Sequence, residues 1–146
     1  MIILRVGGVT WKDCLEMIFK MGFLRFYDKE RDEFPLEHKI IIPPEQVKIL
    51  VNKLVRHYEL PKVKVEFSKR NKFEGAYQHR SGSDPCLLKF CIKGINLSII
   101  VHEVAHHYQR IKQNKTGHTK RLMTVIRRIT KYCVKMNYWG YDTNEY

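Results

Sequence analysis

The sequence predicts an α+β fold in which a small antiparallel or mixed sheet of about three strands packs on two helices of the carboxyl-terminal half. Three observations predict it. Apolar residues recur at helical spacing over residues 44–58, short strand-like segments follow between residues 63 and 92, and two more helical patterns begin near residues 99 and 118. A chain of 146 residues is normally one domain and is long enough to bury a core without disulfide bonds.

The first 42 residues are predicted to be an extension that packs on the domain formed by residues 43–146. Thr10 is placed to cap a short helix with Ile18 on its apolar face, and Gly22 would end it. Residues 28–33 mix both charges and are expected to be a solvated loop. The start of the chain lacks the pattern of a signal peptide, and no apolar run approaches membrane-spanning length. We therefore expect an intracellular, cytoplasmic protein with reduced cysteines.

The predicted domain opens with a helix. Over residues 44–58 the apolar positions share one face, Pro44 stands in the first turn where its missing N–H costs least, and Pro61 ends the pattern. Residues 63–67 then alternate apolar and charged side chains, which predicts a half-buried strand.

Two more strands are expected before the next helix. Residues 69–72 form a polar turn signal that leads into a segment over residues 73–79. Residues 86–92 are an apolar run interrupted only by Lys89, which predicts a third strand before the next helix. The order helix, three strands, helix, helix gives the predicted α+β class.

The segment His102-Glu103-Val104-Ala105-His106 reads H-E-x-x-H. Side chains at i and i+4 lie on one face of a helix, so the imidazoles of His102 and His106 can share one tetrahedral Zn²⁺. Glu103 then lies beside the ion, where its carboxylate can take a proton from a water that the metal activates. This pattern predicts a zinc hydrolase site.

The surrounding segment is suited to a helix. Residues 99–111 contain neither Gly nor Pro, Asn96 or Ser98 can serve as N-cap, and Gly117 is a stop signal. At about 100° per residue, Gln109 shares the face of the two histidines. The opposite, core-facing side is expected to hold Ile100, Val104, Tyr108 and Ile111.

A catalytic zinc usually takes three protein ligands, so a third is needed. Residues 104–140 contain no Asp or Glu, which excludes the downstream glutamate of thermolysin-like enzymes unless Asp142 or Glu145 returns from the tail. The metzincin pattern needs histidine where this chain has Lys112. His118, after a short loop and at the start of the next helical pattern, is the best remaining donor.

Two other potential ligands have simpler roles. His107 is adjacent to His106 and points about 100° away around the helix, so we expect it to pack or hydrogen-bond near Glu103. Cys133 is expected to be a buried thiol, because it falls in the apolar stripe of the last helix with Leu122, Ile126, Ile129 and Met136.

Taken together, H-E-x-x-H, a short basic loop and a Gly-His pair at residues 117–118 resemble the catalytic domain of the SprT-like metallopeptidases, which include the Spartan-type proteases. The resemblance covers roughly residues 44–138. It implies a zincin-like fold with Glu103 as catalytic base, and some family members cut proteins bound or crosslinked to DNA. It also implies that zinc is held by His102, His106 and His118.

The chain departs from the family's pattern at two points. Leu122 stands where many members have an aromatic residue, and the four cysteines form no C-x-x-C pair of the kind found in a zinc ribbon. In zincins the strand just before the metal helix resembles an edge that pairs with an extended substrate peptide. That expectation falls on residues 86–92 here.

Charge is the second informative feature. Lys and Arg number 27 against 15 Asp and Glu, a formal net charge of +12, and nine of the basic residues lie in the acid-free segment 104–140. A cationic helix face of this kind can bind DNA phosphates non-specifically, and an acidic protein substrate or solvent alone would explain it as well. The expected nucleic-acid contacts are Lys120, Arg127, Arg128, Lys131 and Lys135.

The sequence thus predicts a zinc-dependent metalloendopeptidase that acts on a protein or peptide substrate, with no membrane partner. The oxyanion stabiliser is left open among Arg121, Tyr132, Tyr138 and Tyr141. The alternative is a basic nucleic-acid-binding protein whose zinc site is structural or inactive, with a fourth ligand such as Cys133 or Asp142. A further alternative is a peptidase dedicated to one partner protein, with no nucleic acid involved.

Overall fold

The computed structural model describes residues 25–35, 37, 39–69 and 74–136. The chain divides into two compact units, residues 1–33 and residues 34–146. The described part of the first unit is helical from residue 25 to residue 33, and the predicted helix after Thr10 lies outside the described residues. The expectation of a loop over residues 28–33 is therefore wrong. Opposite charges three residues apart, as in the Arg31–Asp28 pair at 3.8 Å, are compatible with a helix.

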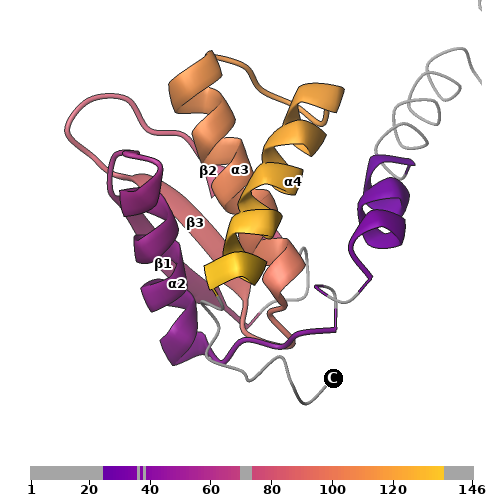
Figure 1. The fold of residues 1–146 in the computed structure, drawn as a ribbon. Coiled ribbons are helices and arrows are strands. Elements are labelled where there is room, and N and C mark those ends of the chain that lie inside the picture. Colours follow the sequence, from indigo (N-terminus) through magenta and orange to yellow (C-terminus); the bar gives the residue numbers. More distant parts are fainter. Residues whose placement is uncertain (1–24, 36, 38, 70–73, 137–146) are drawn as a thin grey trace, which may run out of the picture. The chain divides into compact units, whose positions relative to one another are not determined.

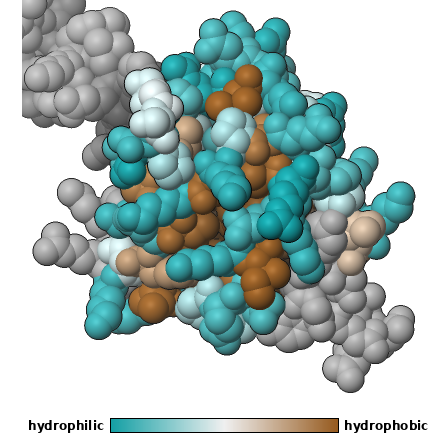
Figure 2. All heavy atoms as spheres, turned by 90° about the vertical axis from the view of Figure 1, so that its left-hand side faces the viewer, coloured by the Kyte–Doolittle hydropathy of each residue, from teal (hydrophilic) through white to brown (hydrophobic). Residues whose placement is uncertain are grey.

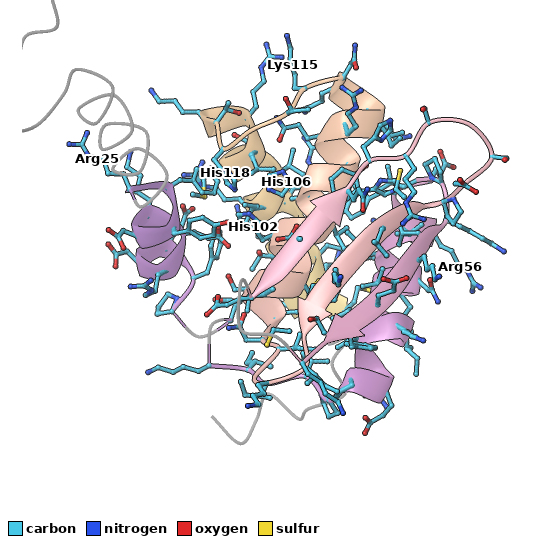
Figure 3. The ribbon with its side chains drawn as sticks, turned by 180° about the vertical axis from the view of Figure 1, so that it is seen from behind. Arg25, Arg56, His102, His106, Lys115 and His118 are labelled. Carbon is cyan, nitrogen blue, oxygen red and sulfur yellow. The ribbon has the colours of Figure 1, made fainter. Side chains whose placement is uncertain are left out.

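The second unit has the predicted α+β composition (Figure 1). Its sheet is mixed and has three strands in the order β1-β3-β2. Helices α2, α3 and α4 lie on one side of this sheet, as Figures 1 and 3 show from opposite directions. The elements are α2 (Pro44–His57), β1 (Val63–Ser68), β2 (Gly75–Gln78), β3 (Cys86–Cys91), α3 (Leu97–Gln113) and α4 (Lys120–Met136).

Strand β3 is the centre of the sheet. It pairs in parallel with β1, where Val65 is opposite Leu88, and antiparallel with β2, where Tyr77 is opposite the same residue. The expectation that the strand just before the metal helix forms the edge is therefore wrong. Because β3 lies between β1 and β2, strand β2 is an edge strand of the described sheet.

Helix α2 packs through an apolar stripe whose members Val47, Leu50 and Leu54 are at most 1% exposed. Pro44 occupies the first turn, as predicted. The helix ends at His57, before Pro61. The other side of α2 meets solvent, and Figure 2 shows this side of the molecule with hydrophilic side chains over much of its surface and hydrophobic ones visible between them.

Helix α3 is capped by Asn96, whose Oδ1 accepts a hydrogen bond of 2.9 Å from the backbone N–H of Ile99. It ends at Gln113, because Asn114 adopts the left-handed conformation with φ 50°. The stop is thus Asn114 rather than Gly117. Ile111, expected in the core, is 37% exposed in the last turn of the helix.

Helix α4 packs on α3 through the predicted stripe, in which Leu122, Ile126, Ile129 and Cys133 are at most 1% exposed. Met136, expected in the same stripe, is 47% exposed at the end of the helix. The basic residues predicted to lie on the other face are exposed: Lys120, Arg127, Arg128, Lys131 and Lys135. Among the described residues, no helix has the length and apolar character needed to cross a membrane.

Candidate metal centre

The three predicted metal ligands converge. The Nε2 atom of His102 lies 3.1 Å from that of His106 and 3.2 Å from that of His118. One ligand atom from each residue lies within 4.8 Å of the others, and no other such group occurs among the described residues. Figure 3 shows the three side chains together, two from α3 and one from the loop before α4.

These distances fit a zinc ion. Zinc–nitrogen bonds of about 2.05 Å in tetrahedral geometry would separate the nitrogens by roughly 3.3 Å, and the two observed separations from His102 are 3.2 and 3.1 Å. Three neutral imidazoles are a donor set that zinc accepts, and the set leaves a fourth position for a reactant. The residues present therefore fit the ion.

The electrostatics of the centre favour the ligand form of the imidazoles. Burial, and then the neighbouring rings of His102 and His118, lower the pKa of His106 to about 3. Neutral His106 keeps a lone pair for a metal near neutral pH, because proton competition for that nitrogen is weak.

The loop between α3 and α4 brings His118 back to the helix. Asn114 turns the chain in the left-handed conformation, and the N–H of Lys115 donates to the carbonyl of Gln109 at 3.3 Å. Gly117, at φ 89°, supplies a second turn that an L side chain rarely adopts. Thr119 then starts α4, since its hydroxyl accepts from the N–H of Leu122 at 3.4 Å. His118 is held between these two turns.

Glu103 lies under the edge strand. Its side chain is 5% exposed, and Gly75 of β2 approaches it so closely that an added Cβ would stand 3.2 Å from Oε1 and 3.1 Å from Cγ. The same Cβ would stand 2.8 Å from Cγ2 of Ile99. Only glycine allows the strand backbone to come this near to the carboxylate.

His107 is fully buried one helical turn after Glu103, and its two ring nitrogens have Pro61 and Tyr77 as hydrogen-bond partners. Its Nε2 lies 2.9 Å from the carbonyl oxygen of Pro61, and its Nδ1 lies 3.0 Å from the hydroxyl of Tyr77. Tyr77 in turn places its ring parallel to that of His106, at an interplanar angle of 3° and a centroid distance of 6.4 Å. Tyr77 is therefore part of the wall of the metal centre.

The candidate oxyanion stabilisers are placed differently. Arg121 lies in the first turn of α4, beside the loop that carries His118. Tyr132 stacks on His57 at a centroid distance of 3.6 Å, at the end of α2. Tyr138 and Tyr141 lie outside the described residues. Of the four, Arg121 is thus the residue that the described structure places next to a ligand in the chain.

A basic pocket of about 290 Å³ adjoins the His118 loop. It is lined by Lys115, Thr116, Thr119, Lys120 and Arg121. Of the other predicted nucleic-acid contacts, Arg128 donates a 2.8 Å hydrogen bond to the hydroxyl of Tyr108.

Sequence reasoning missed two residues of this centre, Gly75 and Tyr77. A signal existed for the first, because a glycine inside a strand pattern often marks a close backbone approach. No local signal existed for Tyr77, whose role depends on which helix its strand covers. Comparison with protein-family models, curated proteins and solved structures found no match for this chain.

Proposed function

We propose that the protein is a zinc metalloendopeptidase of SprT-like type with a zincin-like fold. The observation that carries the proposal is the convergence of three imidazole nitrogens next to a buried glutamate. His102 and His106 lie one helical turn apart, and His118 arrives from the following loop. This is the ligand number that a catalytic zinc uses, with one position left for a reactant.

The reaction follows from the residues around this position. When bound, zinc would supply a Lewis acid that lowers the pKa of a water molecule and polarises the scissile carbonyl. Glu103 removes the proton of the attacking water and then delivers it to the leaving amine. Burial of Glu103 beneath β2 restricts its access to bulk water, which keeps the proton within the site. His102, His106 and His118 hold the ion.

The edge strand supports a peptide substrate. Strand β2 pairs with β3 on one side, and within the described sheet its other side has no partner strand. An extended peptide that pairs with this free side would gain main-chain hydrogen bonds with little side-chain preference. Because Gly75 adjoins Glu103, a peptide bond near this end of β2 would be close to the base.

The test is zinc quantification followed by a casein cleavage assay with the parent protein and Glu103→Gln. We expect the variant to retain zinc and lose hydrolysis, because the change removes the base and spares the ligands. His118→Ala is the matched ligand variant, and we expect it to lower zinc content. Cleavage by Glu103→Gln at the parental rate would refute the assigned mechanism, and undiminished zinc in His118→Ala would require another third ligand.

We further propose that the substrates include proteins on or near DNA. The support is the basic face next to the site, with Lys115, Lys120 and Arg121 around one pocket and no acidic residue from 104 to 140. Phosphate contacts weaken steeply with salt. Single-stranded DNA added to the casein assay should therefore change the rate at low salt and lose its effect at high salt. A casein cleavage rate that does not change with added DNA at any salt concentration would favour a peptidase whose partner is a protein alone.

The alternative of a structural zinc site depends on a fourth protein ligand. Cys133 is 0% exposed in the apolar stripe of α4 and does not belong to the histidine group, and Asp142 lies outside the described residues. Metal spectroscopy on the cobalt-substituted protein would decide this point. A spectrum that responds to an added small anion indicates an open position, and one that does not indicates a closed site.

A further inference from the structure

Strand β2 runs along α3, and alternate residues of the strand contact residues one helical turn apart. Its residues Gly75 and Tyr77 point to the helix, the first against Glu103 and the second against His107. Two residues of a strand advance about 6.8 Å, and four residues of a helix advance about 6 Å. The spacing of Gly75 and Tyr77 along the strand therefore matches the spacing of Glu103 and His107 along the helix. As a result, the contact between Tyr77 and His107 sets the position of Gly75 over the Glu103 carboxylate.

The contact at Tyr77 is a directed chain of hydrogen bonds. The carbonyl of Pro61 only accepts, so Nε2 of His107 must donate to it across 2.9 Å. The neutral ring then has a lone pair at Nδ1, which accepts from the Tyr77 hydroxyl at 3.0 Å. The hydroxyl oxygen remains able to accept from Nδ1 of His79, 3.2 Å away. That nitrogen also lies 3.4 Å from Sγ of Cys86, so the defined part of this chain runs from Pro61 through His107 to Tyr77.

The protonation states agree with these roles. Burial lowers the pKa of His107, which favours the neutral ring. Burial, and after it the neighbouring Cys86, raises the pKa of the Tyr77 hydroxyl, so that the hydroxyl keeps its proton.

This chain joins three parts of the fold. Tyr77 is on the edge strand, His107 is on the metal helix, and Pro61 is in the link between α2 and β1. Strand β2 has four residues and one strand partner in the described sheet, so hydrogen bonds to β3 alone leave its height over α3 weakly fixed. A phenylalanine at residue 77 would fill the same apolar space but would not fasten the strand to the helix.

We propose that Tyr77 and His107 are positioning residues, which fix the height of the edge strand over the metal helix and thereby the gap between the β2 backbone and the metal centre. The inference rests on the proposed function, since a peptide substrate would pair along the free side of β2, and the height of this strand sets how far the peptide lies from the metal centre. It assigns the Tyr77 hydroxyl a role in peptide binding without contact with the ion.

The experiment compares two zinc-chelating inhibitors on the zinc-loaded protein by calorimetry. Acetohydroxamate binds only the metal centre, whereas a peptidyl hydroxamate also spans the gap beside β2. In Tyr77→Phe we expect about tenfold weaker binding of the peptidyl hydroxamate, because a shift of about 1 Å in a positioning element costs up to a hundredfold. Binding of acetohydroxamate should stay at the parental value, and kcat/KM for peptide cleavage should fall with the peptidyl affinity.

Tyr108→Phe is the matched control. It removes a hydrogen-bonded hydroxyl from the same helix, one that accepts from Arg128 at 2.8 Å, and we expect both inhibitors to bind it as they bind the parent. Imidazole ¹⁵N NMR supplies a second readout, in which the Nδ1 resonance of His107 should shift in Tyr77→Phe alone.

The outcomes separate the two proposals. Parental affinity of folded Tyr77→Phe for the peptidyl hydroxamate overturns the positioning role, as does an equal loss in Tyr108→Phe. If the parent protein binds the peptidyl inhibitor more tightly than acetohydroxamate but cleaves no peptide, the proposed catalysis fails, and the effect of Tyr77→Phe on that difference still decides the positioning role. If the parent shows no such difference, both proposals fail.

Discussion

Gly75→Ala tests the contact between the edge strand and Glu103, the proposed catalytic base. The added Cβ would stand 2.8 Å from Cγ2 of Ile99 and 3.2 Å from Oε1 of Glu103. Comfortable carbon–carbon contact begins at about 3.5 Å, so the strand or the two side chains must yield by roughly 0.7 Å. Overpacking of this kind destabilises a domain by about 1–3 kcal/mol.

The effect on catalysis should be larger than the effect on folding. If the strand yields to Ile99, the β2 backbone moves by about 0.7 Å relative to Glu103, which approaches the 1 Å that costs a factor of about 100 in rate. We therefore expect kcat for peptide cleavage to fall ten- to a hundredfold in Gly75→Ala, while the zinc content stays unchanged because no ligand moves. The assay is steady-state cleavage of a fluorogenic peptide, together with urea unfolding and metal analysis.

Ala76→Ser is the control, since the next residue of the strand faces away from α3 and the change adds one heavy atom there. We expect it to leave kcat and zinc content as in the parent. Full activity and parental stability of Gly75→Ala would refute the reasoning, because the strand would then tolerate a side chain where the structure has no room for one.

Two further predictions concern helix capping and the buried thiol. Asn96→Ala should lower the free energy of unfolding by about 0.5–2 kcal/mol, measured in urea, because the cap of α3 loses its bond to the N–H of Ile99; an unchanged midpoint would contradict this. Burial raises the pKa of the Cys133 thiol to about 12 from an ordinary value of 9. The folded protein thus favours the protonated thiol, and this stabilisation is fully present below pH 9 and is lost as the pH rises from 9 to 12. Alkylation at pH 8 followed by mass spectrometry should leave Cys133 unmodified in the folded protein and modified in urea, and labelling of the folded protein would show that the site is open.

The parts of the fold that follow local rules were predictable from the sequence. Periodicity predicts α2, α3, α4 and the three strands, and the i, i+4 geometry of a helix predicts that His102 lies beside His106. His118 required a different route, in which the absence of acidic residues over 104–140 removed its competitors. The structure brings this third histidine to the other two.

The errors fall where the answer depends on distant partners. The order of strands in a sheet is set by non-local pairing, so the sequence did not reveal that β3 is central and that β2 is an edge. Helical periodicity assumes a packing partner along the whole length, and it therefore placed Ile111 and Met136 in the core although they lie at exposed helix ends. The hydrogen bonds from Tyr77 through His107 to Pro61 join three separate segments of the chain, and no rule based on residue spacing predicts them.

The origin of the third ligand has a consequence for the mechanics of the chain. His106 is in α3, whereas His118 belongs to the turn that starts α4. An ion held by both would act as a clasp across the hairpin of the two helices, and its binding energy would contribute to keeping α4 in place. Chelation would then remove the ion and at the same time weaken the attachment of α4 to α3.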